Sequence, residues 1–311
     1  MDNNGTILYS DIARTFFVLA TSSAIFRNHF EALPMAGVVK RDFPRINDEG
    51  FGFQWGRETT NSASDGTDTD PTLDEYAIEV DSLEGFHEVR DGFVLFNPAG
   101  AAFVQQNLIP GMRRGMQRAE DKAGFLSVGS APYSTKWRGL KGAVGATVIA
   151  SSTNGDAFTL DMMGVFLRAM PARLREDPSR LAYYLPPARC DDFVDLIAAR
   201  ATTGGDAYVG MRPGQENLVA PGMVPIGFYR NIPVYSTWCL PTSETQGTST
   251  DAATGYLVHR DMVKIGDGAA VRIEPYRKPG FKTRLQIQTF VGVGYPDPAG
   301  IVRRAGIRPK A

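Results

Sequence analysis

The sequence predicts an α+β fold, in which helices and strands follow one another without a regular alternation of the two. Some stretches place apolar residues three and four positions apart, which is the spacing of an amphipathic helix. Other stretches alternate apolar and polar residues, which indicates strands with one buried face. The two patterns are mixed along the chain and no internal repeat separates them, so an α+β arrangement is favoured over separate all-helical and all-strand parts.

The composition is that of a globular protein with little net charge. The chain has 311 residues, of which 43% are hydrophobic, and a formal net charge of −1. This length is enough for about two domains. A protein that coats nucleic acid with its whole surface would be more basic. The basic residues near the C-terminus form either a solvated tail or a local nucleic-acid contact. They are Arg303, Arg304, Arg308 and Lys310.

The cysteines and the N-terminal apolar run exclude several classes of protein. Cys190 and Cys239 are far apart in the sequence, so they form neither a disulfide framework nor a zinc cluster, and a reducing compartment is favoured. The run from 12 to 26 contains Arg14 and several hydroxyl residues, and it is too short and too polar to span a membrane. It also lacks the basic leader of a signal peptide. We therefore expect a soluble protein with no membrane contact.

The first part of the chain is predicted to form a helical arm followed by a long β-hairpin. Residues 7–33 have helical spacing up to a proline, and residues 35–50 are expected to be irregular. Alternating apolar residues predict strands at 51–58 and 76–80, and the residues between them, 59–72, include no large apolar side chain. Because two strands alone are marginally stable in water, this hairpin needs a partner surface on its own chain or on another.

A helix of roughly 25 residues, nearly 40 Å long, is predicted for 97–123. Asn97 and Pro98 suit its start, and Gly124 suits a left-handed stop. Pro110 removes a backbone donor and is expected to bend the helix. The apolar stripe consists of Ala101, Val104, Leu108, Met112, Met116, Ala119 and Ala123.

Two neighbouring acids, Glu120 and Asp121, lie in the predicted last turn, where the helix dipole disfavours negative charge. Arg118 has the spacing to offset Asp121. Two interpretations remain for Glu120. Either another segment or another subunit supplies a cation, or Glu120 is a solvated surface acid.

The rest of the chain is predicted as a mixture of helices, strands and one polar loop. The loop is 244–254. We expect helices at 160–174 and directly after Pro187, the latter with Cys190 facing inward. The predicted strands are small strands within 143–150, then 181–185, a strand–turn–strand at 224–237, 256–259, 270–276 and 284–293.

A search for catalytic and metal-binding motifs finds none. The three histidines, His29, His87 and His259, are isolated, and the sequence lacks a P-loop, a nucleophile elbow and a complete dinucleotide fingerprint. The acids of the polar tip resemble a calcium loop only loosely, since the required glycine and final glutamate are missing. These acids are Asp65, Asp68 and Asp70. We expect no catalytic residue, cofactor or metal, although a scattered active site of a soluble hydrolase stays an alternative.

Three stretches and their order along the chain resemble a known family. They are RAEDKAGFLSVG at 118–129, RLAYYLPPARCDDFVDLI at 180–197, and PIGFYRNIPVYSTWCLP at 225–241 with KIGDG at 264–268. Together with the hairpin and the long helix, they resemble the major capsid proteins of tailed bacteriophages, which have the Hong Kong 97 fold.

The resemblance implies a division of the chain into five parts. They are an N-terminal arm at 1–48, an extended β-hairpin loop at 49–90, a peripheral domain at 91–155 with the spine helix 97–123, an axial domain at 156–255, and return strands of the peripheral domain at 256–311. It implies a structural protein rather than an enzyme. Hexamers and pentamers of the chain would form an icosahedral virion shell around double-stranded DNA, assembled in the host cytoplasm with a portal.

The resemblance also suggests which residues contact neighbouring subunits. They are Phe53, Trp55, Arg57, Glu58, Arg118, Glu120 and Asp121. At least one of the two acids is expected to pair with an Arg or Lys of another subunit or of the hairpin. No lysine lies between Lys40 and Lys122, so a covalent cross-link through a hairpin lysine, as in some members of the family, is not expected. There is no room for a long N-terminal scaffolding domain, which implies either a separate scaffold protein or a chain that has already been trimmed. The initiating Met1 favours the separate scaffold protein. An encapsulin-type compartment is the alternative with the same fold.

Overall fold

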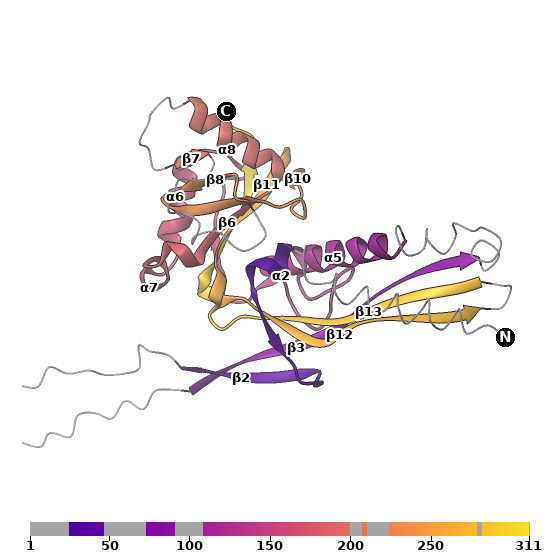
Figure 1. Cartoon of the computed structure of the whole chain (residues 1–311). Coiled ribbons are helices and arrows are strands. Elements are labelled where there is room, and N and C mark those ends of the chain that lie inside the picture. The colour runs from indigo at the N-terminus through magenta and orange to yellow at the C-terminus, as the bar shows by residue number, and fades with distance from the viewer. Residues whose placement is uncertain are drawn as a thin grey trace, which may run out of the picture.

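The computed structural model describes residues 25–46, 73–90, 108–199, 207–209, 224–278 and 282–310. Within these ranges the chain forms two β-sheets with helices packed on both (Figure 1). One sheet is long and narrow, and helix α5, Ile109–Leu126, lies along it. The other belongs to a more compact part that also holds α6, α7 and α8. The prediction of a mixed helix-and-strand fold is confirmed.

The long sheet has five strands in the order β1-β12-β13-β3-β2. Strand β1 is parallel to β12, and the other neighbours are antiparallel. The strands are β1 Glu31–Pro34, β2 Lys40–Ile46, β3 Leu73–Arg90, β12 Lys264–Lys278 and β13 Lys282–Gly294.

Alternation along β13 explains how this sheet receives α5. Every second side chain from Thr283 to Val291 is buried, as the alternating sequence predicts. On that face Leu285 and Ile287 form a small core with Ile109 and Met116 of α5. The helix therefore covers one face of the long strands. The side of α5 that points away from these strands is left to solvent.

The end of α5 differs from the prediction. Gly124 does not stop the helix, which continues to Leu126. A Cβ atom at Gly124 would lie 2.6 Å from the ring of Phe26. The glycine is thus needed for the close approach of an aromatic ring rather than for a left-handed turn. The predicted start at Asn97 lies outside the described residues, and Pro110 lies in the first turn of the described helix.

The hairpin is confirmed in part. Strand β3 includes the predicted strand at 76–80 and is much longer. Its described partner is β2, in a region expected to be irregular, and the predicted strand at 51–58 lies outside the described residues. The sequence predicted an irregular segment here because Pro44 has no backbone N–H to donate within a sheet. β2 is an edge strand, and a proline is tolerated in an edge strand.

The second sheet has nine strands, seven of them in the order β4-β14-β11-β6-β9-β8-β7. Strand β10 pairs with β11, and β5 pairs with β14. The strands are β4 Thr147–Ile149, β5 Asp156–Ala157, β6 Leu181–Leu185, β7 Ala207–Val209, β8 Gly227–Tyr229, β9 Ile232–Ser236, β10 Glu244–Gln246, β11 Ser249–His259 and β14 Ile301–Arg308.

Three helices flank this sheet: α6 Leu160–Ala169, α7 Ala172–Arg175 and α8 Pro187–Ala199. Their apolar faces share one core with β6, β9, β11 and β14. Cys190 is buried in it, as predicted. The single helix expected at 160–174 is instead two, because Pro171 starts a new one.

Two further expectations are corrected. Helix α2, Ile25–His29, is followed by β1, so the helical arm does not continue to residue 33. Residues 244–254 form β10 and most of β11 rather than a polar loop. Strand β14 lies in the nine-stranded sheet, whereas β12 and β13 lie in the five-stranded one.

Candidate functional site

The candidate site is the junction at which the C-terminal end of α5 meets α2 and the start of β12. Glu120 and Asp121 are each only 3% exposed here, although carboxylates are among the residues least often buried. A buried carboxylate needs a cation or several hydrogen bonds. Both acids have such partners in segments far away in the sequence.

Glu120 is held by Arg27 of α2. The Arg27 Nε atom lies 2.6 Å from Glu120 Oε1. The two terminal nitrogens of Arg27 donate to the two carboxylate oxygens of Asp267 in β12, at 3.1 and 3.2 Å. One guanidinium therefore connects α5, α2 and β12, in the fork geometry that suits arginine better than lysine.

Asp121 is held by backbone groups of α2. Its Oδ1 atom accepts the Phe26 N–H at 2.9 Å, and Oδ2 accepts the Ile25 N–H at 3.3 Å. These are the first amides of α2 within the described residues, and the first amides of a helix have no partner inside it. Asp121 therefore attaches the described start of α2 to the last turns of α5.

Burial shifts the protonation of both acids toward neutral pH. It raises the pKa of Glu120 to about 7, against the attraction of Arg27 and together with the repulsion of Asp121. It raises the pKa of Asp121 to about 6, against the hydrogen bonds from Phe26 and Ile25. Burial alone would lower the pKa of Arg27, but Glu120 and Asp267 raise it, so this residue stays charged. When the pH changes near neutrality, the net charge of the junction changes because Glu120 and Asp121 gain or lose protons, while Arg27 keeps its charge.

Aromatic rings pack around this polar cluster. The Phe26 ring lies over Gly124 and meets Phe125 edge-on, with centroids 5.6 Å apart. Phe125 in turn meets Tyr184 of β6 at 5.4 Å. These rings belong to a core that takes residues from both sheets. The acid pair therefore lies where the two halves of the molecule are joined.

The expectations for the acids are corrected by this geometry. The interpretation of Glu120 as a solvated surface acid is wrong, and the one in which another segment supplies a cation is confirmed. That cation is Arg27 of the same chain, so neither the hairpin nor another subunit is needed to supply it. Arg118 does not offset Asp121. It is exposed, and its guanidinium lies 5.7 Å from the ring centroid of Trp238.

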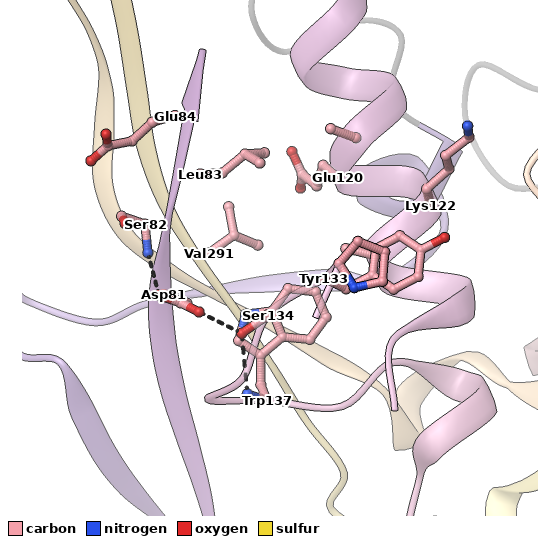
Figure 2. Close-up of a pocket in the computed structure, with 13 residues that line it drawn as sticks. Asp81, Ser82, Leu83, Glu84, Glu120, Lys122, Tyr133, Ser134, Trp137 and Val291 are labelled. Atoms are coloured by element: carbon pink, nitrogen blue, oxygen red, sulfur yellow. Dashed lines mark hydrogen bonds between the residues drawn. The ribbon is translucent and has the colours of Figure 1, made fainter. Parts of the chain in front are cut away.

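Beside the junction, a depression of about 370 Å³ lies between α5, β3 and the loop at 132–137 (Figure 2). Asp81 accepts hydrogen bonds from the Ser134 hydroxyl at 2.8 Å and from the Ser82 N–H at 2.9 Å. The backbone N–H of Trp137 donates to the Ser134 hydroxyl oxygen at 3.3 Å. These bonds attach the loop to β3, so the polar groups at this end of the depression serve the fold.

The hairpin residues expected to contact neighbouring subunits lie outside the described residues. They are Phe53, Trp55, Arg57 and Glu58. The important residues that the sequence did not point to are Arg27, Asp267 and Trp238. Arg27 and Asp267 are separated by 240 positions, and no local pattern pairs them.

The described residues offer little for catalysis or metal binding. They hold no group of three or more His, Cys, Asp or Glu placed to bind a metal ion. Asp65, Asp68 and Asp70 lie outside the described ranges. Burial raises the pKa of both cysteine thiols to about 12, which makes them poor nucleophiles. Burial lowers the pKa of His29 to about 3, so it stays neutral. No helix in the described ranges is both long and apolar enough to cross a membrane.

The basic residues near the C-terminus are engaged within the chain. Arg304 lies 2.5 Å from Asp156, and Arg308 lies 3.8 Å from Asp251. Lys310 pairs with Asp195, and Arg303 donates to the Lys141 carbonyl. The four residues of the expected tail therefore belong to strand β14 and its extension, and they do not form a free basic segment.

Neither a family model nor a curated protein matches the sequence, but solved structures do. The capsid protein of an empty GTA particle matches with a TM-score of 0.63 at 14% identity, over 92% of this chain and 90% of that one. The satellite phage P4 procapsid matches with a TM-score of 0.57 at 13% identity, over 95% and 91%. The encapsulin complex of Synechococcus elongatus matches with a TM-score of 0.58 at 9% identity, over 90% and 85%.

These likenesses extend over nearly the whole of each chain. At such identities they show a shared fold. The chain therefore has the mixed helix-and-strand fold of phage capsid proteins, as its resemblance to that family predicted. The encapsulin has the same fold, so the fold alone does not decide what a shell of this protein encloses.

Proposed function

We propose that this chain is the major capsid protein of a tailed bacteriophage. It is a structural subunit rather than an enzyme, and copies of it assemble into the icosahedral head shell around double-stranded DNA. The observation that supports this proposal most is the match to phage capsid structures over nine-tenths or more of this chain. The scarcity of reactive side chains among the described residues agrees with such a role.

In this proposal the two sheets correspond to the two domains of the Hong Kong 97 fold. The five-stranded sheet and α5 form the peripheral domain with its spine helix. The nine-stranded sheet with α6, α7 and α8 forms the axial domain, which gathers around the five-fold and six-fold axes. The axial domain then includes β4 and β14, which lie outside the range 156–255.

The hairpin and the arm provide contacts between subunits. Figure 1 shows β2 and the adjoining end of β3 projecting away from the rest of the described chain. A two-stranded arm of this kind needs a surface to lie on, and a neighbouring subunit offers one. The hairpin residues from Phe53 to Glu58 are proposed to make this contact. Repeated around the axes, such contacts close a shell of pentamers and hexamers.

The further partners follow from assembly in a host cytoplasm. A scaffold protein encoded separately guides the shell, a portal occupies one vertex, and DNA is packaged inside. Electron microscopy of the protein, expressed alone and with its neighbouring genes, tests the proposal. We expect closed shells, tubes, or rings of five and six subunits. A small monomer under every condition overturns the proposal and favours the soluble hydrolase.

A second candidate is an encapsulin-type compartment, which the likeness to the Synechococcus elongatus structure favours. Purified native particles decide between the two after external nuclease treatment. A phage capsid releases double-stranded DNA of uniform length when it is opened. A compartment releases a cargo protein and no such DNA.

A further inference from the structure

The solvent-facing side of α5 carries a row of cations. Arg114, Arg118 and Lys122 are all exposed and are spaced four residues apart, so they lie on one face of the helix. At 1.5 Å per residue the row is about 12 Å long, with a charge every 6 Å or so. We call these three residues and the adjacent Trp238 the α5 basic stripe.

No acid of the described residues forms an ion pair with these three cations. The two acids of the same helix, Glu120 and Asp121, are buried below the stripe and bound to α2. Figure 2 shows Lys122 extending from the side of α5 opposite to the acids of β3, Asp81 and Glu84. Among the described residues, the outward face of this helix is therefore positive and has no paired acid.

Several other exposed cations of the described chain are paired with acids. Arg173 lies 2.8 Å from Asp297, Arg180 lies 3.1 Å from Asp177, and Lys136 lies 3.4 Å from Glu79. The three cations of the stripe differ from these in being neighbours that no acid of the described residues pairs with. Such a local concentration of charge attracts a polyanion even where the whole protein is neutral.

Trp238 holds this charge in place. It is 42% exposed, which is high for a tryptophan, and it follows β9 at the junction of the two sheets. The Arg118 guanidinium and the Lys122 ammonium each lie 5.7 Å from its ring centroid. A cation–π contact orders a cation without neutralising it. Arg118 and Lys122 are therefore preorganised and keep their full charge for a partner.

We propose that the α5 basic stripe binds the phosphate backbone of double-stranded DNA without reading its sequence. The cations form a straight row spaced on the scale of the phosphates of a strand, and no base-reading element accompanies them among the residues that the structure describes. A protein partner would be expected to find more apolar surface at the centre of its contact. The proposal rests on the proposed function, and it assigns Arg118 to DNA rather than to the subunit contact that the sequence suggested.

The test compares the original protein, a stripe variant and a control variant, each as the purified, unassembled subunit. Fluorescence anisotropy measures the affinity of each for a 20-base-pair duplex over a range of salt concentrations. The stripe variant carries Arg114→Gln, Arg118→Gln and Lys122→Gln. The control variant carries Lys136→Gln, Arg173→Gln and Arg180→Gln, which change the net charge equally but remove cations from weak surface pairs. Circular dichroism and gel filtration establish that each variant is folded.

We expect the stripe variant to bind DNA about ten- to a hundredfold more weakly near 0.1 M salt. The slope of log affinity against log salt should become shallower by about 0.9 for each phosphate that the variant no longer neutralises. The control variant should bind like the original protein. If the stripe variant is poorly folded, the single variants Arg114→Gln and Lys122→Gln provide the second measurement, since each removes one exposed cation and should weaken DNA binding and make the salt slope shallower. Unchanged affinity in both folded single variants overturns the proposal.

Several outcomes overturn the proposal. They are equal losses of affinity in the stripe and control variants, an unchanged affinity in the stripe variant, and no DNA binding by the original protein. A stripe variant that binds DNA normally but no longer assembles means that the stripe contacts protein instead. Shell formation by the original protein is scored separately by microscopy, so failure of the capsid assignment is distinguished from failure of the DNA contact.

Discussion

Arg27 is the residue on which the junction most depends, because it is the cation that compensates the buried carboxylate of Glu120. Arg27→Met removes the charge and keeps most of the apolar stem. Without Arg27 the pKa of Glu120 rises further, so at pH 8 the folded variant must either protonate this carboxylate or bury it without a counterion, and breaking such a pair costs about 3 kcal/mol. Urea unfolding of the unassembled subunit at pH 8 measures the loss of stability.

The matched variant for this prediction carries Arg27→Met together with Glu120→Leu. Replacing both members of a buried ion pair with apolar residues recovers much of the stability, because no uncompensated charge is left. A double variant as unstable as the single one would show that Arg27 acts through Asp267 rather than through Glu120.

The raised pKa of Glu120 predicts a dependence of stability on pH with a definite sign. Because the folded state holds the proton more tightly than the unfolded state, the benefit is complete below pH 4.5 and is lost as the pH rises to about 7. As the pH rises from 4.5 to 8, the free energy of unfolding of the original protein should therefore fall relative to that of the Glu120→Gln variant, whose amide does not titrate. A pKa raised from 4.5 to about 7 corresponds to a change of about 3 kcal/mol, at about 1.36 kcal/mol for each pH unit.

The comparison between these two proteins removes the other titrations from the result. The lowered pKa of His29, which is due to burial, acts in the opposite direction and makes stability rise with pH up to 6.5. His29 and Asp121 are present in both proteins, so their contributions largely cancel in the difference. A difference that stays constant between pH 4.5 and 8 would contradict the prediction.

At the scale of the element, the glycines of α5 have different roles that a pair of substitutions separates. At Gly124 a Cβ atom would lie 2.6 Å from the buried ring of Phe26, whereas at Gly115 it would meet nothing within 4 Å. Gly124→Ala should destabilise the protein by about 1–3 kcal/mol through overpacking. Gly115→Ala should stabilise it by up to about 1 kcal/mol through helix propensity.

Thermal unfolding of the two variants measures these changes. Both substitutions are Gly→Ala in the same helix, so both change the helix propensity in the same way. The difference between the two changes in stability therefore reports the contact of residue 124 with Phe26. If both variants gained stability, the Phe26 ring would have moved aside at little cost, and α2 would be less firmly packed than the structure indicates.

The elements that the sequence predicts well are those with a clear period and one buried face. β13 alternates between half-buried and buried residues from Lys282 to Val291. β8 and β9 flank Arg230 and Asn231, whose positive φ angles make the turn between them. The elements it predicts poorly are decided by neighbours. β2 contains Pro44 and is extended because it pairs with β3, and α5 passes Gly124 because Phe26 packs there.

The candidate site was visible in the sequence only as an anomaly. Two acids in the last turn of a helix are unfavourable by themselves, and this indicated that something else compensates them. What compensates them is a guanidinium 93 positions away and two backbone amides about as distant. Such pairing is set by the topology of the sheets, so no spacing in the sequence predicts it.

At the scale of the whole molecule, the sequence predicts shells held together without covalent links between subunits. An amide cross-link through the hairpin requires a lysine amine there, and positions 41–121 contain none. Particles boiled in denaturant should therefore run as a single band at the mass of one chain. The same particles treated with a lysine-reactive cross-linker serve as the control and should give a ladder of bands. A ladder without the reagent would contradict the prediction. If the prediction holds, the stability of the shell comes from many modest contacts repeated by symmetry, and it should depend on subunit concentration during disassembly in denaturant.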